Sequence, residues 1–191
     1  MQTIEFTIKG TAPIMFSKEN LPFEEEVGKG NGRTNKNETP MEQAAKCLHT
    51  INGNGKGSLA AIPAHSLLKG MQAVTTIALG RSTRKSWVKL VKGGIKIEPA
   101  FLPVDPQNWT LDVRRAGTSN KGPGTGAKLY RPRFDDWSAS GTIVYDDEHL
   151  SAQDVRSLLD TNGRFNGLGS YRVGVGGPFG SFIVTKWEDD S

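Results

Sequence analysis

The sequence predicts an α+β fold of the ferredoxin-like (RRM-like) type, with an antiparallel sheet that carries two helices on one face. Several segments alternate apolar and polar residues, which is typical of half-buried strands, and two others repeat apolar residues every three or four positions, which is typical of helices. When long polar excursions are set aside, the order is strand, helix, strand, strand, helix, strand. This is the βαββαβ pattern.

The first strand is expected over residues 3–9, where isoleucine and phenylalanine alternate with threonine and glutamate. Residues 11–16 continue it past a bend. The stretch at about 18–57 is mostly polar and glycine-rich, and it forms the first excursion. Within it a short helix is expected over 40–49, because Thr39 precedes a proline and a capping-box glutamate.

Residues 58–62 can form a short strand, and the first main helix follows, ending near Gly80. Residues 81–92 form a strongly basic linker. A kinked strand is expected over 95–104, and a second strand over 109–114 should pair with it.

A long basic hairpin is expected at 114–133, with a glycine-rich tip. Another strand occupies 137–145, and a second main helix, with a serine cap, runs over 151–161. A glycine-rich loop then leads to the last strand, at 182–187. The chain is predicted to form one domain, 1–191, with its excursions at about 18–57 and 114–133.

Composition narrows the function. No apolar run approaches membrane length, and the start alternates like a strand instead of forming a leader, so we expect a cytoplasmic protein with no membrane partner. The single cysteine, Cys47, excludes an internal disulfide, and with three dispersed histidines we expect no metal site. No Walker motif or dinucleotide fingerprint is present, so we expect no cofactor.

The net charge of +4 is unevenly distributed. Residues 69–133 carry thirteen Lys/Arg and three acidic residues, whereas residues 134–191 carry four and ten. Aromatic residues are interleaved with the basic ones, the combination that single-stranded nucleic acid requires, although Trp87 could equally anchor the core. The candidate contacts here are Lys69, Arg84, Lys85, Trp87, Lys89, Arg114, Arg115, Lys128, Tyr130, Arg131 and Arg133.

The loop Gly163–Gly180 holds seven glycines in eighteen residues. Glycine adopts positive φ and allows close approach, so such a loop can offer bare N–H groups to a phosphate. Its aromatic residues distinguish it from a flexible linker. The candidate contacts are Arg164, Gly167, Gly169, Tyr171, Arg172, Gly176 and Gly177.

Two segments resemble the RAMP superfamily of RNA-binding proteins of CRISPR systems. Gly167–Phe182 is similar to the family's C-terminal glycine-rich loop and the strand after it. Ala61-Ile-Pro-Ala-His-Ser-Leu-Leu-Lys-Gly-Met71 is similar to the start of the first helix in the backbone subunits. The resemblance implies phosphate contacts from Lys69, Arg164 and Arg172, a thumb-like hairpin between Arg114 and Arg133, and self-association along the ligand. The chain is shorter than typical backbone subunits, which suggests a minimal, stand-alone or phage-encoded relative.

Three functions are consistent with these features. The first is non-catalytic binding of single-stranded nucleic acid, RNA more than DNA, through the phosphate backbone. The second is a phage-encoded protein that binds CRISPR-complex subunits and mimics or blocks the complex. The third is a metal-independent endoribonuclease in which His65 and Lys69, one helical turn apart, act on one phosphate.

Overall fold

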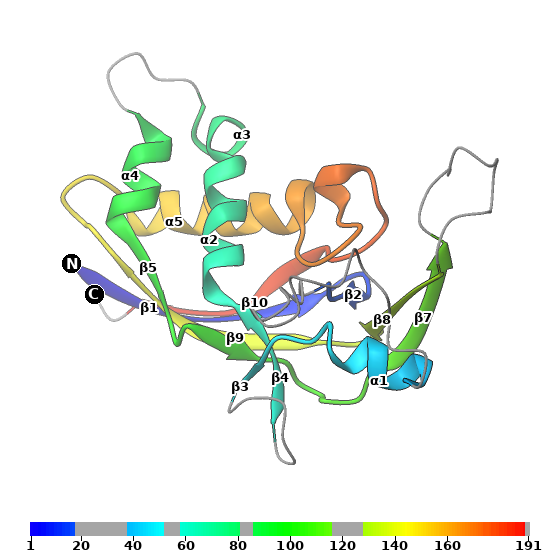
Figure 1. Ribbon diagram of the computed structural model, residues 1–191. Helices are drawn as coiled ribbons and strands as arrows, with labels where there is room; N and C mark the ends of the chain where they lie inside the picture. Colours follow the sequence, from blue (N-terminus) through cyan, green and yellow to red (C-terminus); the bar gives the residue numbers. More distant parts are fainter. Residues whose placement is uncertain (18–37, 52–57, 81–85, 116–127, 190–191) are drawn as a thin grey trace, which may run out of the picture.

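The main sheet has four antiparallel strands in the order β10-β1-β9-β5 (Figure 1). The computed structural model describes residues 1–17, 38–51, 58–80, 86–115 and 128–189. Ile4 of β1 lies opposite Ile143 of β9, which in turn lies opposite Ile97 of β5. The strands are β1 (Gln2–Gly10), β5 (Ile95–Glu98), β9 (Ser138–Tyr145) and β10 (Phe182–Asp189).

Helices cover one face of this sheet (Figure 1). Ile4, Phe6 and Ile8 of β1 are buried beneath them, whereas the alternate residues Glu5 and Lys9 are exposed, so period-two patterning separates the core from solvent. The α+β class and the antiparallel sheet are therefore confirmed. The covering helices are α2 (Ala64–Ala73), α3 (Thr75–Leu79), α4 (Trp87–Gly94) and α5 (Ala152–Thr161).

Two small sheets flank the main one. The first joins β2 (Ile14–Met15), β8 (Lys128–Phe134) and β7 (Thr110–Arg115), and the second joins β3 (Thr50–Ile51), β4 (Leu59–Pro63) and β6 (Phe101–Pro103). The short helix α1 (Pro40–Ala45) lies against β8. Its predicted capping box is present, with the Thr39 hydroxyl accepting from the Glu42 N–H at 3.3 Å.

Three local predictions were wrong. The expected linker at 81–92 contains most of α4, because Trp87, Leu90 and Val91 recur at helical spacing and pack against the core. The expected single strand 95–104 is divided between β5 and β6, which belong to different sheets. The strand at 109–114 does not pair with 95–104 but with β8, the next strand along the chain, as consecutive strands commonly do, and so forms one arm of the predicted basic hairpin.

The glycine-rich segment begins with helical turns. A π-helical turn, η2 (Asn162–Asn166), extends α5, and a 3₁₀ turn, η3 (Val173–Val175), follows farther along. Among the described helices, none combines the length and the apolar character that crossing a membrane requires. Much of the first excursion and the tip of the second, at 116–127, lie outside the described residues.

Candidate nucleic-acid interface

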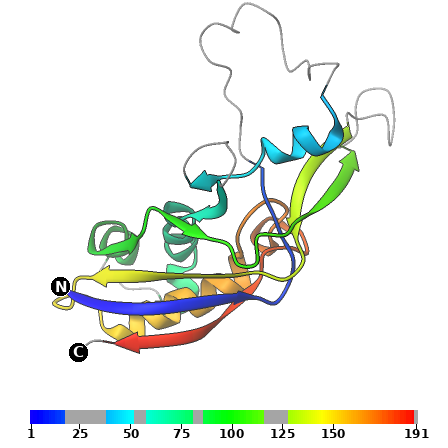
Figure 2. The same ribbon diagram turned by 90° about the horizontal axis from the view of Figure 1, so that it is seen from below.

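The arms of the predicted basic hairpin, β7 and β8, project from one end of the main sheet (Figures 1 and 2). Asp112 lies opposite Arg131 and Thr110 lies opposite Arg133. Residues opposite each other, and residues two apart on one strand, share a face, so Asp112, Arg114, Arg131 and Arg133 lie on the same side of the hairpin. We call these four residues the arginine face.

Asp112 is the centre of the arginine face. Its carboxylate accepts from Arg114 Nε at 2.6 Å and Nη2 at 3.2 Å, and from Arg133 Nη1 at 3.4 Å. Only 7% of Asp112 is exposed, which is rare for a carboxylate unless it is paired. Its hydrogen bond raises the pKa of Arg114 above the ordinary value.

The glycine-rich loop is fastened to the chain that follows β1. Ser170 N–H donates to Met15 O at 2.7 Å and Gly180 N–H donates to Pro13 O at 2.8 Å. A Cβ at Gly180 would lie 1.8 Å from Leu168 O, and the φ of Gly180 is +75°. These glycines therefore serve close backbone packing.

The N–H groups of three predicted contacts are occupied within the loop. Gly167 donates to Asn162 O at 2.7 Å, Gly176 to Val173 O at 3.0 Å and Gly177 to Arg172 O at 3.1 Å. The expectation of bare donors is wrong for these residues, because the loop satisfies its own backbone. Gly169, the fourth, has a φ of +77°, and a Cβ there would lie 2.5 Å from Met15 O.

The hairpin and the loop meet at aromatic rings. The Arg114 guanidinium carbon lies 4.7 Å from the Phe179 ring centre and 5.6 Å from that of Tyr171, and Arg131 lies 5.5 Å from Tyr171. These are cation–π distances. Tyr171 is 41% exposed and has a φ of +53°, an uncommon conformation for a residue with a side chain. Two predicted elements thus form one surface, which we call the hairpin–loop junction.

A buried amide network connects the loop to α2. Asn162, fully buried, donates from Nδ2 to Leu67 O at 3.3 Å and accepts from Asn166 Nδ2 at 2.9 Å. Arg172 Nε donates to Asn166 Oδ1 at 3.4 Å. Lys69 is exposed on α2, two residues after Leu67, and Arg164 is exposed on η2. The network therefore fixes the position of Arg172, a predicted phosphate contact.

Other predicted contacts lie elsewhere. Lys89 is exposed on α4, and Trp87, on the same helix, is half-buried against the core, at the opposite end of the molecule from the hairpin (Figure 1). Arg115 lies opposite Lys128, and Val113 opposite Tyr130, on the other side of the hairpin from the arginine face. Arg84 and Lys85 lie outside the described residues.

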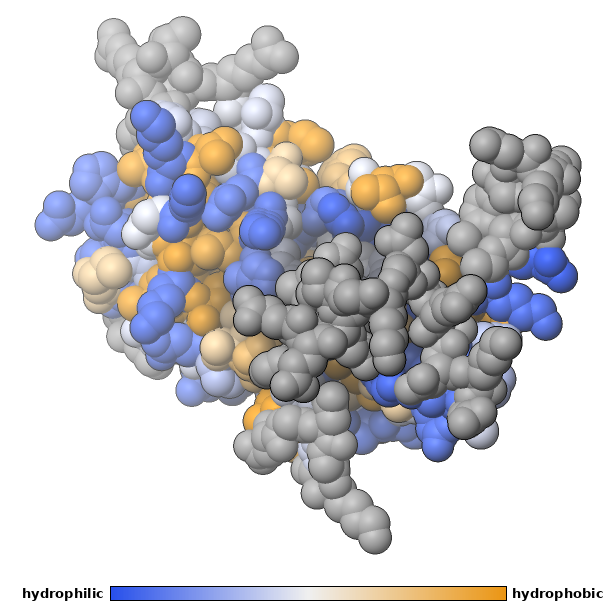
Figure 3. Space-filling model, viewed as in Figure 1, coloured by the Kyte–Doolittle hydropathy of each residue, from blue (hydrophilic) through white to orange (hydrophobic). Residues whose placement is uncertain are grey.

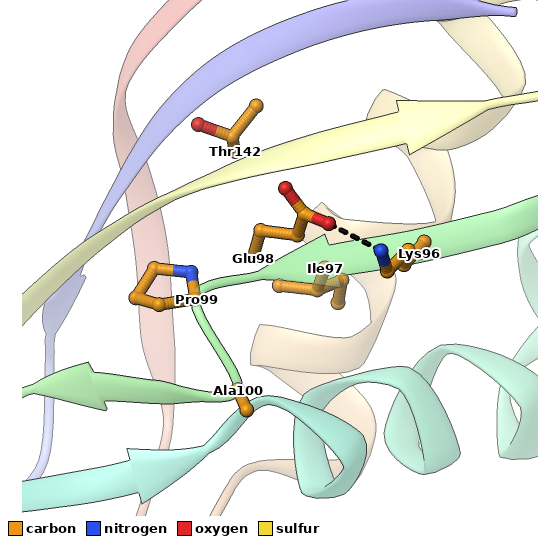
Figure 4. Close-up of a pocket in the computed structure, with 6 residues that line it drawn as sticks. All are labelled: Lys96, Ile97, Glu98, Pro99, Ala100 and Thr142. Atoms are coloured by element: carbon orange, nitrogen blue, oxygen red, sulfur yellow. Dashed lines mark ion pairs between the residues drawn. The ribbon is translucent and has the colours of Figure 1, made fainter. Parts of the chain in front are cut away.

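His65 is exposed at the start of α2, one turn before Lys69. It lines a shallow hollow with Leu68, Lys96 and Phe101. A neighbouring hollow is lined by Lys96, Ile97, Glu98, Pro99, Ala100 and Thr142, and there Lys96 pairs with Glu98 (Figure 4). The ribonuclease hypothesis stays a prediction.

Sequence reasoning missed Asp112 and Phe179 as parts of the interface. Asp112 alternates with apolar residues and stands two positions before Arg114, a spacing that puts both side chains on one side of a strand. That signal could have identified the ion pair. Hydrophilic side chains also border the hairpin in the surface view (Figure 3).

Comparison with known proteins gives a structural likeness. No family model and no curated protein matches the sequence. A chain of a structure described as the Type III-B Cmr-beta bound to cognate target RNA matches with a TM-score of 0.58 and 13% identity, over 98% of this chain and 60% of that chain. The protein thus spans about 60% of the length of that relative.

A chain of a Cas6 product complex also matches, at 13% identity over 94% of this chain and 50% of that one, but its TM-score of 0.27 is too low to support an argument. The Cmr likeness extends over nearly the whole chain and agrees with the resemblance carried by Ala61–Met71 and Gly167–Phe182. The chain therefore shares the fold of that Cmr-beta chain over nearly its whole length.

Proposed function

We propose that this protein binds single-stranded RNA without cleaving it, and that the RNA lies across the hairpin–loop junction. The observation that carries the proposal is the convergence of Arg114 and Arg131 on the exposed ring of Tyr171. A cation beside a stacking surface is what a single strand needs, with phosphate on the guanidinium and a base on the ring. The likeness to a chain from an RNA-bound Cmr structure supports RNA over DNA.

The open face of the main sheet is a poor alternative. The strand order, with α2 and α5 in the two crossovers, supports a ferredoxin-like, RRM-like reading of the domain. RRM sheets stack bases on aromatic residues, but the outward positions of the four described strands hold none. Lys186 there pairs with Glu5 at 3.0 Å and with Glu188 at 2.9 Å. This face is already neutralised.

Arg131 is the best candidate for a phosphate contact. Arg114 and Arg133 are paired with Asp112, and Arg133 also with Asp135 at 2.9 Å. Among the described residues, no carboxylate pairs with Arg131. The Arg131 guanidinium lies beside the Tyr171 ring and can donate hydrogen bonds to the oxygens of a phosphodiester.

The test is the salt dependence of binding to a fluorescent 20-nucleotide oligouridine. We expect affinity to fall steeply between 50 and 200 mM salt. Arg131→Gln should weaken binding and lower the slope of log K against log salt by about 0.7, the value for one phosphate contact on a single strand. Lys92→Gln, which removes one charge from exposed α4, is the matched control and should leave binding unchanged.

Salt-independent binding, or equal effects of the two substitutions, would contradict the proposed site. The same reactions test catalysis, because a non-cleaving protein leaves the oligonucleotide intact on a denaturing gel. Cleavage that is lost in His65→Ala would favour the ribonuclease instead. An absence of binding at 50 mM salt would contradict the proposed function itself.

A further inference from the structure

Asp112 is an acidic residue buried in the middle of a basic surface. It accepts two hydrogen bonds from Arg114 and one from Arg133, and it stands opposite Arg131. A carboxylate lowers the net charge of a site meant for phosphate, so its place there needs a reason.

We infer that Asp112 is a positioning residue that fixes Arg114 between the hairpin and the glycine-rich loop, and so holds the hairpin–loop junction in its RNA-binding form. The Arg114 guanidinium is held by a carboxylate on the hairpin and by aromatic rings on the loop. Asp112 holds two of its nitrogens, and the guanidinium carbon lies over Phe179 at 4.7 Å and near Tyr171 at 5.6 Å. This inference rests on the proposed function.

The physical reason is that Asp112 restricts the conformations of the Arg114 side chain. A free arginine samples many rotamers, and a bidentate carboxylate restricts it to the one in which its plane can meet the rings. The carboxylate also offsets the mutual repulsion of three guanidinium groups on one side of a two-stranded hairpin. Without it, Arg114 would turn toward solvent, Phe179 would lose its cation and Tyr171 would keep only Arg131.

Charge and positioning make opposite predictions for Asp112→Asn. If Asp112 only lowers the positive charge of the site, the substitution removes one negative charge and RNA binds more tightly. If Asp112 positions Arg114, RNA binds more weakly although the net charge of the site is more positive. We expect a loss of about threefold to thirtyfold, the range for residues that act on a site through a neighbour.

Asp135→Asn is the matched control. It makes the same charge change next to the hairpin, directly after β8, and Asp135 pairs with Arg133 but not with Arg114 among the described contacts. We expect binding of Asp135→Asn to equal that of the native protein or to be slightly tighter. Tighter or unchanged binding in Asp112→Asn would overturn the inference and leave the proposed function standing.

Arg114→Lys supplies the second variant. Lysine keeps the charge but cannot make the bidentate pair or present a planar group to the rings. We expect it to weaken binding, and we expect Asp112→Asn to add little in an Arg114→Lys background, because both changes break one contact. Fully additive losses would count against positioning. If Asp112→Asn does not fold, weaker binding by folded Arg114→Lys supports the inference, and unchanged binding overturns it.

A readout without RNA separates the two proposals. The N–H of Val173 donates to Phe179 O and that of Phe179 donates to Tyr171 O. Hydrogen exchange at these amides should accelerate in Asp112→Asn and not in Asp135→Asn. Acceleration in a protein that does not bind oligouridine would keep Asp112 as the junction's positioning residue while removing the RNA-binding function. Equal exchange in both variants would remove the positioning role.

Discussion

Glycines in the loop differ sharply in what surrounds them. At Gly180 a Cβ would overlap Leu168 O at 1.8 Å, whereas at Gly176 a Cβ would meet open space, although both residues have a positive φ. The glycine count alone therefore does not say which of these positions holds the loop together.

Gly176→Ala should cost about 1–2 kcal/mol of unfolding free energy, the cost of a left-handed conformation for a residue with a Cβ. Gly180→Ala should cost more than about 3 kcal/mol, because the backbone must also move. Urea denaturation of both variants measures the difference, and equal losses would show that the loop adapts freely.

Cys47 tests how well α1 covers the hairpin. Its Sγ lies 3.7 Å from Gln43 O and 3.8 Å from Tyr130 O, and burial raises the pKa of its thiol. Because the thiolate is the reactive form, iodoacetamide at pH 8 should alkylate Cys47 more slowly in the folded protein than in urea. Equal rates would mean that α1 does not shield it.

At the scale of elements, the cap of α1 is the simplest feature to test. Thr39→Ala removes the hydroxyl that accepts from Glu42 N–H and should cost about 1 kcal/mol of stability. Thr39→Ser, which keeps the hydroxyl, is the control, and thermal unfolding of both is the measurement. A loss of the same size in the serine variant would contradict the cap.

The cap also makes α1 sensitive to acid. Hydrogen bonds from Thr39 lower the pKa of Glu42 below its ordinary 4.5. A carboxyl with a lower pKa in the folded state stabilises that state above its unfolded pKa. This stabilisation should therefore be complete above about pH 5 and lost as the pH falls through the lowered value. Glu42→Gln should remove that pH dependence in circular dichroism.

Local patterning predicted the elements better than their partners. β1, β9, α5 and β10 follow from period-two and helical spacing with a serine cap, signals that lie within each segment. The hairpin of β7 and β8 was predicted, but the added pairing of 109–114 with 95–104 was wrong, because alternation within a segment does not say which other strand it pairs with. Around α4, the five basic residues at 81–92 hid an apolar stripe that ends in buried Val91.

In the candidate site too, the sequence predicted features within each segment better than contacts between segments. Basic and aromatic residue types predicted the two halves of the hairpin–loop junction, but not that Arg114 would lie on Phe179, nor that Asp112 would neutralise part of the charge. Those facts come from strand register and from the path of the loop. Likewise, α4 lies at the other end of the molecule from the hairpin (Figure 1). Grouping all basic residues of 69–133 into one surface therefore overstated the size of that surface.

At the scale of the whole molecule, the junction should show itself as a protected region. Bound oligouridine should slow hydrogen exchange in β7, β8 and residues 163–180, and leave α4 and β10 unchanged. Mass spectrometry of peptides from these segments reports each one separately. Protection that includes α4 would restore the larger basic surface, and protection centred on β10 would place the ligand on the sheet.

Asn162 and Gly70 illustrate how closely the helices and the loop depend on each other. A Cβ at position 70 would lie 2.2 Å from the Asn162 amide oxygen. The close approach of α2 to that amide therefore requires glycine at position 70. The two positions therefore form a matched size pair. Evolution or design could place alanine at 70 only with a shorter residue at 162. That exchange would release Asn166 and, through it, Arg172.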